Sequence, residues 1–175
     1  MRISRFPLAK NYQNLRVGTQ IEKVCGICCY YLIPIKQNYL LGNGENIAIC
    51  TLSSLDLLDK IGKDKELINK IVIAGRLLSE NKGIDLIIKF INKNEKLRHL
   101  VICGKDVNGH LTGQALLSLK KDGVNEQNRI IGAKGRYPIL SSSLEEIDNF
   151  RNKIDLVNQI GLTDLKKIKT IVFSI

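Results

Sequence analysis

The sequence predicts an α/β domain in which a parallel sheet carries helices on both faces. Short apolar runs suited to buried strands alternate with segments in which apolar residues recur at helical spacing. Such alternation implies crossover connections, which place successive strands parallel to one another. The length of 175 residues and the hydrophobic content of 44% are enough for one such domain with its own core.

The chain begins with a segment that does not follow this pattern. Residues 1–38 are interpreted as a basic lead-in, within which residues 28–35 are one candidate strand. A turn signal at residues 41–44 marks the approach to the first regular apolar run. We therefore expect the α/β domain to occupy residues 39–175.

Two apolar runs, at residues 46–52 and 71–75, predict the first two strands of the domain, with a short helical segment between them. Ser79, Glu80 and Asn81 then offer N-cap groups for the next helix. That helix is expected to bury one stripe, because its apolar residues fall at i, i+3, i+4 and i+7. The stripe consists of Ile84, Ile87, Ile88 and Ile91.

The central part of the chain is a strand that breaks into a glycine-containing loop and then a helix. Residues 99–103 are the expected strand and residues 104–109 the loop. A helix is predicted over residues 111–121, with basic residues in its last turn and Gly123 just beyond it, as helix C-termini prefer. His110 therefore lies where strand, loop and helix meet.

The remaining sequence predicts two more strands and two more helices. Residues 129–133 are the next expected strand, which opens into a loop at residues 134–138. Ser143 and Glu146 match a capping box at the start of a helix, and residues 154–160 follow as the last strand. The closing helix is predicted from apolar residues at Leu165, Ile168 and Val172.

Together these elements define a doubly wound, Rossmann-like fold. In such a fold the loops that leave the carboxyl ends of the strands gather at one edge, where ligands bind. The loops after Ala74, Cys103 and Ala133 would meet there, and all three contain glycine, which lets a backbone approach a ligand closely. We therefore expect the binding site at this edge, around His110.

The net charge of +10 is compatible with nucleic acid, an anionic membrane surface or a phosphorylated ligand as partner. The lysines are scattered along expected helix faces, however, and lack the interleaved aromatic residues of a base-stacking platform. We interpret them as solvated surface and expect no nucleic-acid partner. Because no stretch approaches the ~20 consecutive apolar residues that span a bilayer, we also expect no membrane span and a cytoplasmic location.

The sequence contains five cysteines, and their odd number without a secretory leader indicates reduced thiols. Cys25 and Cys28 have the spacing of a metal-binding or redox pair, but no second pair or nearby histidine completes a tetrahedral site. Buried, unreactive side chains are the favoured interpretation. The remaining cysteines are Cys29, Cys50 and Cys103.

Several ligands are candidates for the central loop. Gly104 and Gly109 have P-loop spacing, but His110 and Leu111 stand where that motif requires lysine and a hydroxyl residue. No dinucleotide glycine motif follows an expected strand, and no serine or cysteine is placed beside His110 for acyl transfer. A metal-bearing cofactor with His110 as axial ligand is the remaining candidate.

Residues 110–113 share the H-x-x-G part of the D-x-H-x-x-G loop by which many corrinoid proteins hold cobalt. Asp106 lies four residues before the histidine instead of two, so its carboxylate is not assumed to support the imidazole. The wider blocks V-I-C-G-K-D-V-N-G-H-L-T-G-Q-A, from residue 101, and R-I-I-G-A-K-G-x-x-P, from residue 129, resemble the corrinoid-carrying A subunit of the archaeal tetrahydromethanopterin:coenzyme M methyltransferase. Supporting matches bring the resemblance to roughly residues 39–165.

The resemblance implies a cobamide, either cobalamin or 5-hydroxybenzimidazolyl cobamide, bound on the Rossmann-like domain with His110 as axial ligand to cobalt. It implies a methyl group that passes from methyl-tetrahydromethanopterin to cobalt and then to coenzyme M, with turnover dependent on methyltransferase partner proteins. It assigns no catalytic side chain, and whether this chain is itself an enzyme stays open. The cofactor-binding residues expected from the loops and the resemblance are Thr51, Leu52, Gly75, Glu80, Asn81, Gly104, Val107, Gly109, His110, Thr112, Gly113, Gln114, Gly132, Ala133, Gly135 and Pro138.

Members of the membrane complex end in a transmembrane helix, whereas this chain stops at Ile175, so we expect a soluble homologue without sodium translocation. Two alternatives remain open from the sequence. One is a cobamide store or sensor that does not take part in methyl transfer. The other is a basic module that binds nucleotides or nucleic acid.

Overall fold

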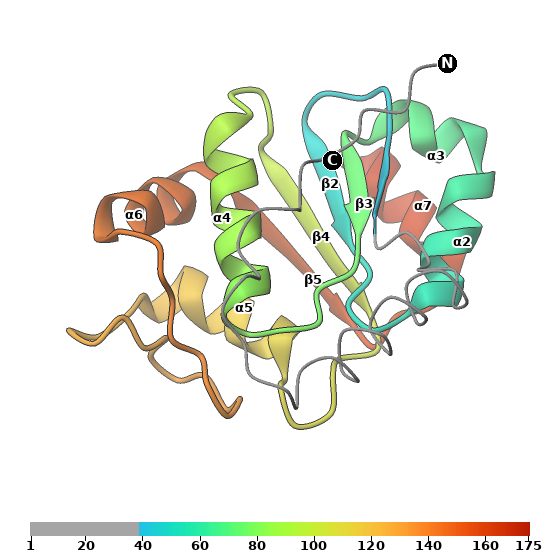
Figure 1. Cartoon of the computed structure of the whole chain (residues 1–175). Coiled ribbons are helices and arrows are strands. Elements are labelled where there is room, and N and C mark those ends of the chain that lie inside the picture. Colours follow the sequence, from blue (N-terminus) through green and yellow to red (C-terminus); the bar gives the residue numbers. More distant parts are fainter. Residues whose placement is uncertain (1–38) are drawn as a thin grey trace, which may run out of the picture. The chain divides into compact units, whose positions relative to one another are not determined.

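A computed structural model of the chain describes residues 39–175, and within them five strands form one sheet in the order β1-β3-β2-β4-β5 (Figure 1). Strand β1 pairs antiparallel with β3, and all other neighbours are parallel. The predicted α/β class with a mostly parallel sheet is therefore confirmed. The strands are β1 (Tyr39–Leu41), β2 (Ile47–Cys50), β3 (Ile73–Gly75), β4 (His99–Gly104) and β5 (Asp155–Ile160).

Helices cover both faces of the sheet, as the sequence predicts. Alternate residues of each strand point to opposite faces, so that Ala48 and Cys50 pack into one core cluster while Ile47 and Ile49 pack into the other. Helices α4, α5 and α6 cover the first face, and α2, α3 and α7 cover the second (Figure 1). The helices are α2 (Leu55–Lys63), α3 (Lys65–Lys70), α4 (Lys82–Lys93), α5 (Thr112–Asp122), α6 (Leu144–Lys153) and α7 (Leu165–Ser174).

The strand order creates a switch point beside β2. From β2 the chain passes through α2 and α3 to β3 on one side, and from β3 it passes through α4 to β4 on the other side. The loops after β2 and β4 therefore diverge at the carboxyl edge of the sheet. A crevice at such a point is the common ligand site of open α/β sheets.

Several predicted ends of helices and strands are confirmed. The Ser143 hydroxyl accepts from the Glu146 N–H, and the Glu146 carboxylate accepts from the Ser143 N–H, which completes the capping box of α6. The Asn81 side chain caps α4, and Gly123 follows α5 with a φ of 73°. Helices α4, α5, α6 and α7 and strands β2, β4 and β5 all lie where the sequence places them.

The strand predicted at residues 129–133 is wrong. This stretch makes only isolated bridges, between Val124 and Ile130 and between Arg129 and Ile139, and it does not join the sheet. Its apolar content misled the prediction, because Ile130 is buried but Ile131 is 46% exposed. The stretch belongs to an irregular segment between α5 and α6, which we call the 124–142 segment (lower left in Figure 1).

Three smaller features also differ from the predictions. Strand β1 falls just before and within the predicted turn, and two helices, α2 and α3, lie where one short helical segment was predicted. Asp64 caps α3 by accepting from the Leu67 N–H. Strand β3 begins at Ile73, because Ile71 still ends α3. The candidate strand at residues 28–35 and the lead-in at residues 1–38 lie outside the described residues and stay predictions.

The packing of α4 makes a testable prediction about stability. Ile88 is fully buried in the first core cluster, whereas Leu86 on the same helix is 69% exposed. We expect Ile88→Ala to lower the free energy of unfolding by about 3 kcal/mol, because it removes buried methyl groups and leaves a cavity. The matched variant Leu86→Ala should change it by less than about 0.5 kcal/mol in the same urea titration. Equal effects of the two changes would contradict this packing.

Candidate functional site

His110 lies at the carboxyl edge of the sheet, in the loop between β4 and α5, and its side chain is 46% exposed. Its Nδ1 atom is 2.6 Å from Oε2 of Glu80, whose side chain is only 2% exposed. An ionised carboxylate can only accept, so Nδ1 of the neutral imidazole carries the proton. Nε2 then keeps its lone pair free for a ligand.

Both carboxylate oxygens of Glu80 accept hydrogen bonds. Its Oε1 atom accepts a hydrogen bond from the Tyr137 N–H at 2.9 Å, while Oε2 contacts His110. Burial alone would raise the pKa of Glu80, but hydrogen bonds from the Tyr137 and Glu80 N–H groups and from His110 outweigh it and leave the pKa below its ordinary value. Glu80 is therefore ionised at neutral pH, as its role as acceptor requires.

Asp106 has a different role. Its carboxylate accepts from the N–H groups of Gly113 (3.0 Å) and Gln114 (3.1 Å) and from the Thr112 hydroxyl (3.2 Å). It replaces the missing N-cap side chain of α5, because the N-cap residue is Leu111, held in the left-handed region with a φ of 46°. Asp106 thus organises the start of the helix, and the carboxylate on His110 comes from Glu80, which lies 30 residues earlier.

The 124–142 segment lies against His110 even though it is not a strand. A Cβ atom at Gly135 would lie 2.3 Å from the backbone oxygen of His110, so only glycine fits there. The Gln114 side chain fixes the same region, since its Oε1 accepts from the Lys134 N–H and its Nε2 donates to the Gly132 oxygen. The three loops expected to meet at this edge therefore do meet, although the third does not follow a strand.

The candidate cofactor residues divide into an exposed group and a supporting group. Gly109, His110 and Gly132 are exposed at the edge. Most of the others lie within the loops or support them, and the Thr112 hydroxyl donates to the Leu77 oxygen at 3.0 Å. The buried group consists of Thr51, Leu52, Glu80, Gly104, Thr112, Gly113, Gly135 and Pro138, and the half-buried group of Gly75, Asn81, Val107, Gln114 and Ala133.

Sequence reasoning missed the part of Tyr137, whose N–H holds Glu80. The two residues are 57 positions apart, and a backbone donor leaves no signal in residue type. It also identified Glu80 only as a helix cap and a cofactor contact. The pairing of Glu80 with His110 depends on the placement of the loops after β3 and β4, which no local pattern reports.

The donor set of the site fits a metal held mainly by a macrocycle. Within residues 39–175 no group of three His, Cys, Asp or Glu side chains is arranged to hold an ion. A single imidazole with a free nitrogen suits the axial position of a metal whose other ligands come from a cofactor ring. Cys50 and Cys103 do not compete for a metal, because burial raises the pKa of each thiol to about 12.

The fold and this edge define an α/β protein that presents one carboxylate-supported histidine at a sheet switch point. A family model for MtrA, the A subunit of tetrahydromethanopterin S-methyltransferase, matches residues 32–174. The chain belongs to this family, which confirms the resemblance expected from the sequence. No helix in the described part of the chain is long and apolar enough to cross a membrane.

Curated relatives support the family assignment. The A subunit of the putative methyltransferase Mtx from Methanosarcina acetivorans is 32% identical over 141 residues, which cover 79% of this chain and 67% of the relative. The protein of the same name from Methanosarcina barkeri is 35% identical over 79% of this chain and 66% of its own length. The second A subunit of tetrahydromethanopterin S-methyltransferase from Methanothermobacter thermautotrophicus is 36% identical over 74% of this chain and 69% of its own length. The chain thus spans about two thirds of these relatives.

The geometry of Asp106 predicts its contribution to stability. We expect Asp106→Ala to cost about 2 kcal/mol of unfolding free energy, because several donors at the start of α5 lose their acceptor together. The exposed neighbour Asn108 in the same loop provides the control, and Asn108→Ala should change stability by less than about 0.5 kcal/mol. Urea unfolding measures both, and an unaffected Asp106→Ala protein would disprove the capping role.

The lowered pKa of Glu80 predicts a pH dependence with a definite sign. Because the pKa is depressed in the folded state, the stabilisation is present above the ordinary value of 4.5 and is lost as the pH falls through the lower folded value. The Tyr137 amide resonance should report this transition by NMR, with a midpoint below 4.5. The transition should vanish in Glu80→Gln, and a midpoint above 4.5 would contradict the assignment.

Proposed function

We propose that this protein binds a cobamide at the carboxyl edge of its sheet, with Nε2 of His110 as the axial ligand to cobalt. The observation that carries the proposal is the hydrogen bond between His110 Nδ1 and the buried Glu80 carboxylate. A carboxylate on the far nitrogen fixes the tautomer of a metal-binding histidine, orients its ring and raises its basicity. Such support is characteristic of ligating histidines.

The surroundings of His110 support the same proposal. The loop side chains that could compete for a cofactor are bound within the protein, as the Asp106 and Gln114 contacts illustrate. The imidazole is exposed together with two glycines of the neighbouring loops, Gly109 and Gly132. Exposed glycines near a single metal ligand would let a broad macrocycle approach the backbone closely.

In methyl transfer each residue would have a limited task. The bound cobamide supplies the cobalt that carries the methyl group. His110 would hold the metal through Nε2, while Glu80 would keep the proton on Nδ1 so that the lone pair of Nε2 stays available. Family membership supports methyl-tetrahydromethanopterin as methyl source and coenzyme M as acceptor, with partner proteins that provide the two transfer reactions. We expect this to take place in the cytoplasm.

Of the alternatives, a cobamide store or sensor would use the same residues. It differs in that the cofactor would accept no methyl group even with partner proteins present. A nucleotide-binding role is disfavoured by geometry, because the N–H groups at the start of α5 already donate to Asp106. A phosphate placed there would face a carboxylate instead of free donors.

The proposal predicts a distinct response to aquocobalamin. We expect the full-length protein to shift its visible absorption spectrum as imidazole replaces water on cobalt, and His110→Ala to abolish the shift. Glu80→Gln should weaken binding by about tenfold or more, because the imidazole loses its support. The chain contains one other histidine, His99, at the opposite end of β4, and His99→Ala serves as the matched control with no effect.

An unchanged spectrum and affinity in His110→Ala would overturn the ligand assignment. Absence of any corrinoid binding at micromolar protein would overturn the function as a whole.

A further inference from the structure

The carboxyl edge has cationic side chains without matching carboxylates. Two carboxylates at this edge, Glu80 and Asp106, accept hydrogen bonds from donors within the protein. Lys134 and Arg136 are exposed at the same edge, and neither takes part in any ion pair among the described residues. The segment that packs against His110 therefore presents two exposed cations that are not engaged in an ion pair.

The backbone that carries these two cations is fixed at three points. The Lys134 N–H donates to the Gln114 side chain at 2.9 Å, and the Tyr137 N–H donates to Glu80 at 2.9 Å. Between these two points, Gly135 packs against the backbone oxygen of His110. The two cations therefore flank the glycine that contacts the histidine. The backbone that carries them is tied to Glu80, the same carboxylate that orients the imidazole.

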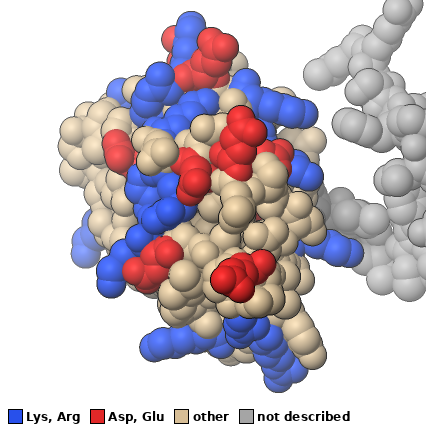
Figure 2. Space-filling view, turned by 90° about the vertical axis from the view of Figure 1, so that its left-hand side faces the viewer, with Lys and Arg blue, Asp and Glu red and all other residues tan. Residues whose placement is uncertain are grey.

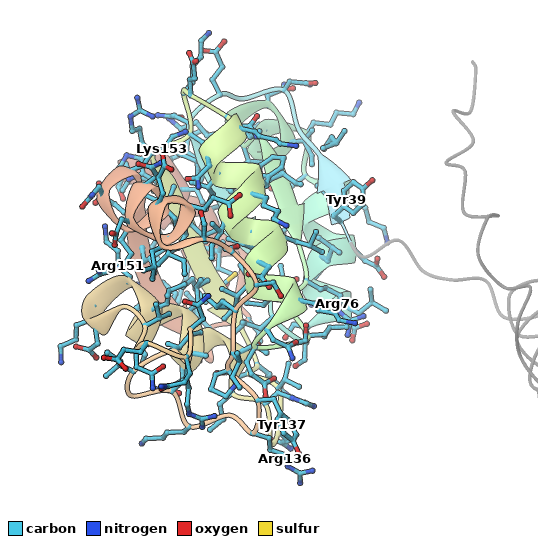
Figure 3. All side chains as sticks on the ribbon, turned by 60° about the vertical axis from the view of Figure 1, so that its left-hand side comes forward. Tyr39, Arg76, Arg136, Tyr137, Arg151 and Lys153 are labelled. Carbon is cyan, nitrogen blue, oxygen red and sulfur yellow. The ribbon has the colours of Figure 1, made fainter. Side chains whose placement is uncertain are left out.

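The pictures agree with this distribution of charge. Figure 3 places Arg136 and Tyr137 together at the lower rim, pointing away from the body of the domain. In Figure 2 the lowest rim shows Lys and Arg without Asp or Glu. Besides Glu80, Asp122 approaches this part of the 124–142 segment, with Oδ2 3.4 Å from where a Cβ on Gly132 would lie.

We propose that Lys134 and Arg136 form an anion clamp that binds the phosphate diester in the nucleotide tail of the cobamide. The inference rests on the proposed function and deepens it. The corrin ring carries neutral amides, so the phosphate is the group of the cofactor that a pair of cations selects. Arginine and lysine both bind phosphate oxygens through charge-assisted hydrogen bonds.

The test compares corrinoids that differ in the phosphate. Visible absorption titrations of the full chain at low ionic strength use cobalamin, cobinamide phosphate and cobinamide, which lacks the phosphate. The double variant Lys134→Gln/Arg136→Gln should lose about tenfold in affinity for the first two, because two exposed cation contacts disappear. Its affinity for cobinamide should equal that of the unaltered protein.

A matched control removes two charges elsewhere. Lys89 and Lys93 are exposed on α4, and Lys89→Gln/Lys93→Gln lowers the net charge by the same amount. It should bind all three corrinoids as the unaltered protein does. Inorganic phosphate should compete with cobalamin for the unaltered protein but not for Lys134→Gln/Arg136→Gln. Added salt should weaken the binding of cobalamin more than the binding of cobinamide.

The outcomes separate the two proposals. If the unaltered protein binds none of the three corrinoids, the proposed function fails. Suppose instead that it binds them, but that Lys134→Gln/Arg136→Gln weakens the binding of cobinamide as much as that of cobalamin, or weakens neither. The clamp is then overturned while the function stands. Inorganic phosphate that competes equally with cobinamide would also overturn the clamp, because the anion would then act away from the tail.

Discussion

The contact between the buried Glu80 carboxylate and His110 is the interaction on which this site depends. A carboxylate that is 2% exposed costs free energy unless donors satisfy it, and here the donors are the imidazole and the Tyr137 backbone. The same two bonds determine which imidazole nitrogen stays free and where the 124–142 segment lies. A single side chain thus couples the orientation of the candidate ligand to the packing of two loops.

Other carboxylates at this end of the domain also act as acceptors for backbone N–H groups. Asp106 caps α5, and Asp85 accepts from the N–H groups of Ser141 and Ser142 and from the Ser142 hydroxyl. These carboxylates stabilise irregular backbone that has no strand partner. Lys134 and Arg136, which are exposed, form no ion pair with these carboxylates.

The family assignment and the geometry carry different parts of the functional argument. Membership in the MtrA family places the chain among relatives of a methyltransferase that uses tetrahydromethanopterin. The geometry adds a histidine with one free nitrogen and no other metal ligands arranged around it within residues 39–175. The role that we propose for His110, an axial ligand to a cobamide, is consistent with both.

The sequence by itself determined the α/β class and most helices, and it indicated His110 as the candidate ligand. Those features depend on local periodicity, as in the stripe from Ile84 to Ile91, or on one contiguous block around residue 110. Tertiary structure alone decided that residues 129–133 lie outside the sheet, since a short apolar run has the same pattern whether or not it finds a strand partner. It also decided that Glu80, and not Asp106, supports His110. Glu80 and His110, 30 positions apart, meet only because the parallel sheet brings the loops after β3 and β4 to one edge. Whether a hydrogen bond forms between them depends on that placement at the scale of an ångström.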